Sequence, residues 1–126
     1  MDITLAGGGI ETRIIYEFKR RIGDFEAYKL LGDEAGRDIL RRIYQSYAEV
    51  AVRYSLPIQL GTRMWRASRK WTKDVESVNA AAVELLRGVM QQFADVRTIL
   101  AGVVGLASDG YATDEVLSAD AAFAYH

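Results

Sequence analysis

The chain has 126 residues, half of them hydrophobic, and its 16 basic residues nearly balance 17 acidic ones for a formal net charge of −1. This length accommodates one packed core, and the balanced charge gives no overall attraction to nucleic acid or to a membrane surface. The chain has no cysteine, and its one histidine, His126, is the last residue, so we expect no disulfide, no metal site and no Ser-His-Asp triad from this chain alone. Since no run of 18 apolar residues and no leader-like segment is present, we expect a cytoplasmic protein.

The first predicted elements are a strand and a long helix. Residues 3–6 form a short apolar run that three glycines follow at 7–9, which is typical of a buried strand and a tight turn. Over residues 33–54 the apolar residues recur every three or four positions, which predicts an amphipathic helix. Asp33 or a neighbour is its expected N-cap, and Arg41, Arg42 and Arg53 lie on its polar side.

The remaining elements continue the alternation of strands and helices. Pro57 cannot extend the helix, and residues 58–60 before Gly61 predict a second strand. We expect a polar loop at 62–74, a second helix at 75–94, a third strand at 98–103 that is buried on both faces, and the start of a helix at 118–126. This alternation predicts a parallel sheet, and the single apolar stripe of each long helix predicts helices on one side of it.

Three motif-like segments directly follow the three predicted strands, which is the functional edge of parallel α/β folds. They read GGGIET at 7–12, GTRMWRAS at 61–68, and GVVG at 102–105 continuing to DGY at 109–111. Taken in this order, they resemble the strand-end segments of the homocysteine S-methyltransferase family. The resemblance extends over nearly the whole chain and corresponds to the N-terminal portion of the family.

The resemblance implies a fold and an activity. The fold is the first three β/α units of a (β/α)8 TIM-type barrel, so that residues 1–126 make a partial homocysteine-binding barrel domain. The family activity is methyl transfer to the sulfur of homocysteine, with a zinc ion held by three cysteines of later strands. Because this chain has no cysteine, we expect it to be inactive alone, with zinc present only if another chain supplies the thiolates.

The resemblance also implies a set of residues that bind an amino-acid substrate. They are Glu11, Thr12, Thr62, Trp65, Arg66 and Asp109. Two acidic positions of the family pattern are occupied here by Gly7 and Gly61, and both losses weaken recognition of a substrate ammonium group. Arg63, Val103 and Leu106 are further departures, where the family usually has proline, cysteine and proline.

Several of these features also have a purely structural explanation. Glu11 is at a predicted helix start, where a carboxylate complements the backbone amides. Five basic residues and two tryptophans within 63–73 resemble a surface for single-stranded nucleic acid, but the balanced charge elsewhere favours a solvated loop. The glycines at 7–9 resemble the start of a dinucleotide-binding motif, but Thr12 occupies the position where that motif needs its last glycine. Tyr44 and Tyr47 lie on the apolar stripe of their helix, where we expect them to pack with their hydroxyl groups in water.

An isolated three-stranded parallel sheet leaves two open edges and one apolar face uncovered. Such a chain needs a complementary barrel chain, a second copy of itself, or collapse into a small open α/β sandwich. Two classes of function follow. The chain is either the substrate-side part of a split methyltransferase that takes a small amino acid, or a non-catalytic interaction module or truncated pseudoenzyme that self-associates or binds a protein partner. Neither a nucleic acid nor a membrane is an expected partner.

Overall fold

The structure is a computed structural model, and it describes residues 2–62, 66–105, 107 and 117–126. The strands are β1 (Leu5–Ala6), β2 (Ile58–Gly61) and β3 (Thr98–Ala101), and the helices are α1 (Glu11–Tyr16), α2 (Glu34–Tyr54), α3 (Val75–Met90) and α4 (Ala119–Tyr125). Three short 3-10 segments complete the described elements: η1 (Gly23–Phe25), η2 (Ala27–Gly32) and η3 (Gln91–Phe93). Among these helices, none is both long enough and apolar enough to cross a bilayer.

The strands form one parallel sheet in the order β1-β2-β3, which confirms the predicted parallel pairing. Leu5 is in register with Ile58, and Ile58 is in register with Thr98. In the described part of the chain, β2 is therefore the central strand, and β1 and β3 are the edges. The prediction that the third strand is buried on both faces is wrong, because all four residues of β3 are only partly buried at the edge of the sheet.

The predicted long helix is confirmed as α2, and local chemistry sets both of its ends. Asp33 is the N-cap, and its side chain accepts a hydrogen bond of 2.7 Å from the backbone N–H of Gly36. At the other end, Ser55 has the left-handed conformation, with φ of 52°, and Pro57 follows two residues later. The helix predicted at 75–94 is also present, as α3 followed directly by η3.

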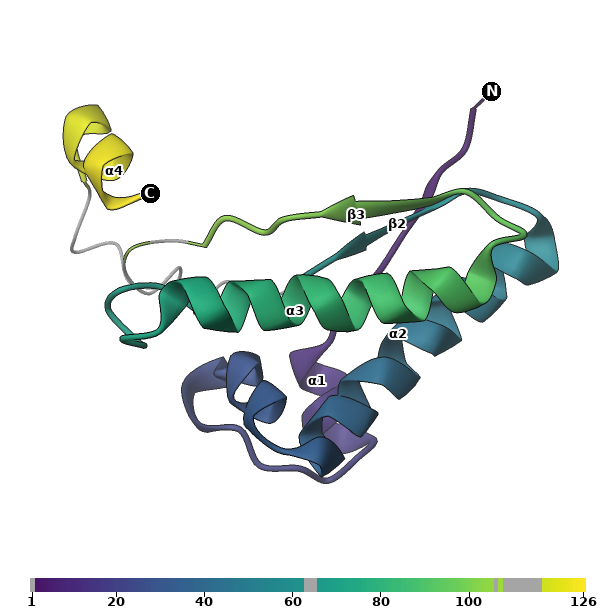
Figure 1. The fold of residues 1–126 in the computed structure, drawn as a ribbon, viewed down its shortest axis with the longest axis horizontal. Helices are drawn as coiled ribbons and strands as arrows, with labels where there is room; N and C mark the ends of the chain where they lie inside the picture. Colours follow the sequence, from purple (N-terminus) through teal and green to yellow (C-terminus); the bar gives the residue numbers. More distant parts are fainter. Residues whose placement is uncertain (1, 63–65, 106, 108–116) are drawn as a thin grey trace.

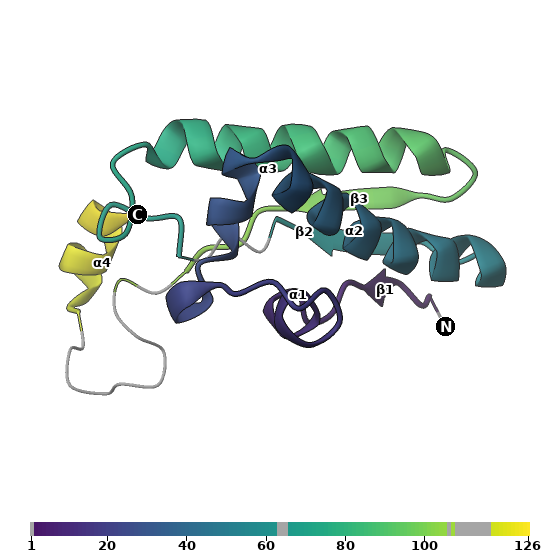
Figure 2. The ribbon, with the colours of Figure 1, turned by 90° about the horizontal axis from the view of Figure 1, so that it is seen from below.

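The core lies between one face of the sheet and the helices α2 and α3, which contact each other. Ile58 and Leu60 of β2 are almost fully buried on this face. Their partners from the helices include Leu40, Ile43 and Leu86, none of which is exposed to solvent. Figure 1 shows the sheet nearly edge-on with α1, α2 and α3 all on one side, and Figure 2 shows the same helices from below.

The expectation of three TIM-barrel β/α units is wrong. In such a barrel, one strand and one helix alternate regularly around a closed sheet. Here the connection from β1 to β2 contains α1, η1, η2 and the 21-residue α2, and β1 itself has only two paired residues. The described residues form a small open α/β domain with a three-stranded parallel sheet and a core of its own. Strand-end motifs carry no information about the strand number, tilt and shear on which barrel closure depends.

Candidate functional site

Two tyrosines of α2 hold the carboxyl ends of β1 and β2. The hydroxyl of Tyr44 donates hydrogen bonds to the carbonyl oxygens of Gly61 at 2.9 Å and Thr62 at 3.2 Å. The hydroxyl of Tyr47 donates to the carbonyl oxygen of Gly9 at 3.1 Å. Tyr44 is only 2% exposed, so the prediction that its hydroxyl stays in water is wrong. A buried tyrosine satisfies its hydroxyl within the protein, and here it does so at the strand ends.

Thr62, a predicted substrate-binding residue, lies at this edge and joins β2 to β3. Its backbone N–H donates to the carbonyl oxygen of Ala101 at 3.0 Å, and its Oγ1 accepts a hydrogen bond from the N–H of Val103 at 3.3 Å. The residue is 4% exposed. The position agrees with the expected functional edge, while the contacts are those of a structural link between two strands.

Glu11 and Thr12 are the first two residues of α1, which begins soon after β1. Glu11 is partly exposed and Thr12 is exposed. A carboxylate in the first helical turn interacts favourably with the positive end of the helix dipole, as the structural explanation of Glu11 requires. The two other predicted residues, Trp65 and Asp109, lie outside the described residues.

Arg66 is buried rather than open to a pocket. The residue is 5% exposed, and its guanidinium carbon lies 4.2 Å from the ring centroid of Trp71. A guanidinium group at this distance over an indole makes a cation–π interaction. Arg66 and Thr62 therefore have different structural roles. Arg66 stacks on an aromatic ring, and Thr62 links two strands.

The sequence analysis missed Glu26, a carboxylate that is 7% exposed. Its two oxygens accept hydrogen bonds from the Tyr28 hydroxyl at 2.8 Å and the Lys29 ammonium at 2.5 Å, and the Tyr28 hydroxyl also reaches the carbonyl oxygen of Trp71 at 3.0 Å. Burial alone would raise the pKa of Glu26, but the hydrogen bonds from Lys29 and Tyr28 and the charge of Arg66 hold it below its ordinary value. Burial, together with the hydrogen bond to Glu26, raises the pKa of Tyr28 to about 12.

A pocket of about 370 Å³ opens beyond the carboxyl ends of β2 and β3. The lining comes from the segments after both strands, from α3 and from the end of α4. Its polar residues are Ser68, Arg69, Glu76, Asn79, Tyr125 and His126. It adjoins a wider hollow of about 750 Å³ at the first turn of α3. One cation and one carboxylate line the smaller pocket, so it offers partners for both charges of a zwitterion.

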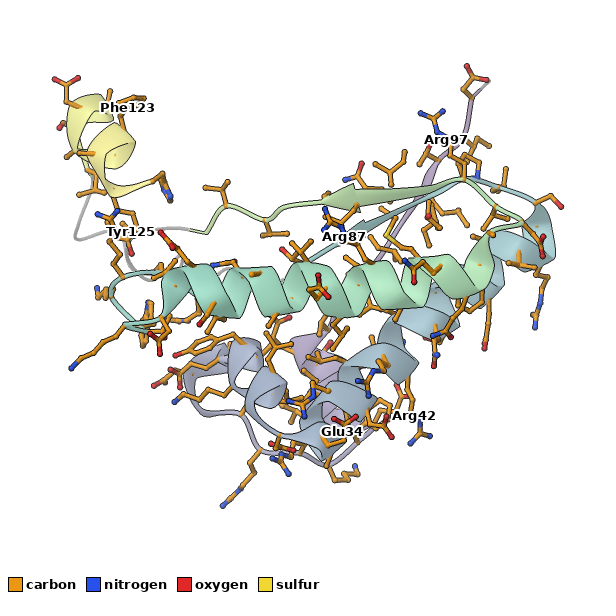
Figure 3. The ribbon with its side chains drawn as sticks, in the orientation of Figure 1. Glu34, Arg42, Arg87, Arg97, Phe123 and Tyr125 are labelled. Atoms are coloured by element: carbon orange, nitrogen blue, oxygen red, sulfur yellow. The ribbon has the colours of Figure 1, made fainter. Side chains whose placement is uncertain are left out.

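One hydrogen bond brings α4 to this pocket. The hydroxyl of Tyr125 donates to Oγ of Ser68 at 2.7 Å, and Figure 3 shows Tyr125 extending from α4 toward the rest of the chain. On the α3 side, the Asn79 amide donates to the carbonyl oxygens of Ala67 at 3.2 Å and Val75 at 2.8 Å. Ala67 and Ser68, which follow β2, are thus held by both helices.

No helix or strand of the described residues packs on the second face of the sheet. Ala6, Gln59 and Ile99 are in register across the three strands, and Gly61 is in register with Ala101. The residues of the same strands that pack in the core are Leu5, Ile58, Leu60 and Leu100. Ala6 and Gln59 are exposed, and Gly61, Ile99 and Ala101 are partly exposed. We call these five residues the open face. Parallel sheets are normally covered on both sides, so the open face is the side of the sheet against which no described helix packs.

Neither metal-site geometry nor known relatives assign a function to these features. Among the described residues, no cluster of three or more histidine, aspartate or glutamate residues has the arrangement needed to hold a metal ion. No family model, curated protein or solved structure matches the chain. The resemblance to homocysteine S-methyltransferases and the zinc that it implies therefore stay predictions.

Proposed function

We propose that this chain is a non-catalytic interaction module that binds a polypeptide through the open face of its sheet. The observation that carries this proposal is the uncovered side of a parallel sheet whose other side is packed against α2 and α3. Figure 1 shows that none of the described helices lies directly over the sheet on this side. The proposal includes a cytoplasmic location, because a cysteine-free chain gains nothing from an oxidising compartment.

The chemistry of the open face favours a polypeptide partner. Ala6, Ile99 and Ala101 are apolar, and Gln59 is the one polar side chain among the strand residues of this face. Ile99 is partly exposed, and covering the rest of such a side chain contributes less than about 1 kcal/mol. A neutral surface of this kind attracts neither phosphate groups nor acidic lipids, but it packs well against another apolar protein surface.

A charge placed on the open face tests this proposal. The variant is Ile99→Lys, and Val52→Lys is its matched control because Val52 is an apolar residue of α2 that is 40% exposed. The measurements are native mass and the fluorescence of an apolar dye such as anilinonaphthalene sulfonate. We expect the wild-type chain either to associate or to bind the dye as a monomer, Ile99→Lys to lose that property, and Val52→Lys to keep it. A wild-type monomer that binds no dye would contradict the proposal.

A second candidate function is amino-acid binding at the strand-end pocket, as the methyltransferase resemblance implies. The specific observation that favours it is the presence of Arg69 and Glu76 in one pocket, where they are suited to the carboxylate and the ammonium of a zwitterion. Any methyl transfer would still need thiolates from another chain, because this one has no cysteine. Tryptophan fluorescence during a titration with homocysteine tests binding.

Four variants sharpen that titration. Arg69→Ala and Glu76→Gln are each expected to weaken the response at least tenfold, whereas Lys70→Ala is the control on an exposed neighbour. Trp65→Ala is expected to remove the ligand-induced change in fluorescence, as its predicted role in substrate binding requires. Responses of Arg69→Ala and Glu76→Gln that equal those of the wild type and Lys70→Ala would contradict amino-acid binding at this pocket.

A further inference from the structure

We propose that the partner of the open face is a second copy of this chain, related to the first by a two-fold axis that runs along β2. The inference rests on the proposed function, because it names the polypeptide that covers that face. It commits to one arrangement of the two sheets. The reasons for it are the charge, the size and the hydrogen-bonding groups of the residues on the open face, and a pair of charged residues beside that face.

The first reason is that the open face has no charge to repel its own copy. Its five residues, Ala6, Gln59, Gly61, Ile99 and Ala101, contain no ionisable side chain. A face with a net charge would meet like charges when paired with itself, and such contacts are unfavourable when water is excluded. A neutral face avoids this cost with a second copy, whereas it offers no counter-charge to an acidic or basic partner.

The second reason is complementarity of size across the proposed axis. Since β1 and β3 lie on opposite sides of β2, a two-fold axis along β2 places β1 of each copy over β3 of the other. Ala6 and Ile99 are in register with the same residue of β2, so the small side chain of one copy lies opposite the large side chain of the other. Facing layers pack best when small residues meet large ones.

The third reason is the central residue of the open face. Gln59 is in the middle strand, between Ala6 and Ile99, so the axis brings it close to the same residue of the second copy. A carboxamide has both donor N–H groups and an acceptor oxygen, and two of them related by a two-fold axis can satisfy each other. This self-pairing is the property that an isologous interface requires.

The fourth reason is a pair of opposite charges at the amino ends of the edge strands. Asp2 precedes β1 and Arg97 directly precedes β3, and both are exposed. Figure 3 shows Arg97 extending away from α2 and α3, toward the uncovered side. With β1 over β3, the carboxylate of each copy lies near the guanidinium group of the other. Their strand registers differ by two residues, or about 7 Å along the strand, which an arginine side chain spans.

Two segments beyond the strands also lie on this side. Figure 1 shows the N-terminal residues and α4 on the uncovered side of the sheet, at opposite ends. The N-terminal segment carries Ile3, and α4 carries Phe123, which is 89% exposed. A second copy placed on the open face would contact both segments, so the interface extends beyond the open face itself.

Single cysteine variants test the arrangement without background, because the native chain has no cysteine. Gln59→Cys alone should cross-link to itself with a short bis-maleimide, and Glu49→Cys on the exposed side of α2 should not. Asp2→Cys and Arg97→Cys should each give little cross-linked dimer alone and at least tenfold more when the two variants are mixed. A two-fold axis along β2 places Asp2 of one copy near Arg97 of the other, so the yield from the mixed variants tests the direction of the axis.

Native mass and dye binding separate this inference from the proposed function. A dimer with the cross-linking pattern above supports the second copy as partner. A monomer that binds the apolar dye, and loses it in Ile99→Lys, overturns the second copy but keeps the interaction module. A monomer that binds no dye overturns both. A dimer in which Glu49→Cys cross-links and Gln59→Cys does not shows that another face associates, and it also overturns the inference.

Discussion

Replacing Tyr44 with phenylalanine should destabilise the protein by removing one hydroxyl group from the core. That hydroxyl donates to the carbonyl oxygens of Gly61 and Thr62, at 2.9 Å and 3.2 Å, and the residue is 2% exposed. A hydrogen bond contributes about 0.5–1.5 kcal/mol net, and a buried acceptor that loses its donor costs about 1–3 kcal/mol. We therefore expect the free energy of unfolding to fall by about 2 kcal/mol in Tyr44→Phe.

Two other tyrosines of α2 provide matched controls for the same chemical change. The Tyr47 hydroxyl donates to the carbonyl oxygen of Gly9 at an exposed position, so Tyr47→Phe should cost about 0.5 kcal/mol. Tyr54 is 64% exposed, and Tyr54→Phe should change stability by less than about 0.5 kcal/mol. The expected order of destabilisation is Tyr44, then Tyr47, then Tyr54.

Urea unfolding followed by circular dichroism measures this order at one fixed protein concentration. With a urea m-value of about 2 kcal/mol per molar, Tyr44→Phe should lower the midpoint by about 1 M, and Tyr54→Phe should leave it unchanged. Equal midpoints for the Tyr44 and Tyr54 variants would refute the reasoning, because the buried hydroxyl would then contribute nothing that an exposed one does not.

Three further predictions follow from the described contacts. The folded-state pKa of Glu26 is lowered below its ordinary value of about 4.5. The carboxylate therefore stabilises the fold above that ordinary value, and this stabilisation is lost as the pH falls through the lower folded pKa. Acidification from pH 7 to 3 should cost the wild type more stability than Glu26→Gln. A Cβ at Gly36 would collide with the backbone of η2, whereas one at Gly88 meets nothing within 4 Å, so Gly36→Ala should destabilise by more than about 2 kcal/mol and Gly88→Ala should stabilise by about 0.5 kcal/mol. Arg97→Glu and Asp2→Lys should each weaken the proposed dimer, and the double charge swap should restore it, as sedimentation can measure.

Each of these predictions has a clear contrary result. Parallel stability curves for the wild type and Glu26→Gln between pH 7 and 3 would show that the carboxylate is not stabilised in the folded state. Equal effects of alanine at Gly36 and Gly88 in thermal unfolding would show that the close approach of η2 is unimportant. If the double charge swap dissociates as readily as either single variant, Asp2 and Arg97 do not face each other in the dimer.

Periodicity and local capping chemistry were sufficient to predict the main elements. The recurrence of apolar residues over 33–54 predicted α2, and Asp33 was expected as its N-cap, because a helix stripe and an N-cap depend on residues three or four positions apart. The strand after Pro57 and the parallel sheet were also predictable. Such patterns state which face of each element is apolar, and they do so correctly for the side of the sheet that packs on α2 and α3.

The contacts between elements that are distant in sequence could not be obtained in this way. Glu26 and Trp71 are joined through Tyr28 over a separation of more than 40 residues, and the Tyr44 hydroxyl reaches the end of β2 from the helix before it. No periodic pattern encodes a single hydrogen bond of this kind, because it depends on how whole elements are oriented after packing. The strand-end segments likewise indicated an edge of the sheet, but neither the burial of Arg66 nor the stacking on Trp71.

The same limit explains the failure of the barrel prediction. Regular alternation of strands and helices is compatible with an open sheet and with a closed barrel, since closure depends on the number, tilt and stagger of all the strands. Those are properties of the assembled sheet rather than of any segment. Apolar β3 was expected to be buried on both faces, yet its position at the edge of the sheet leaves it partly exposed. Composition and periodicity specified helices, strands and their apolar sides, while tertiary packing alone decided which apolar side remained uncovered.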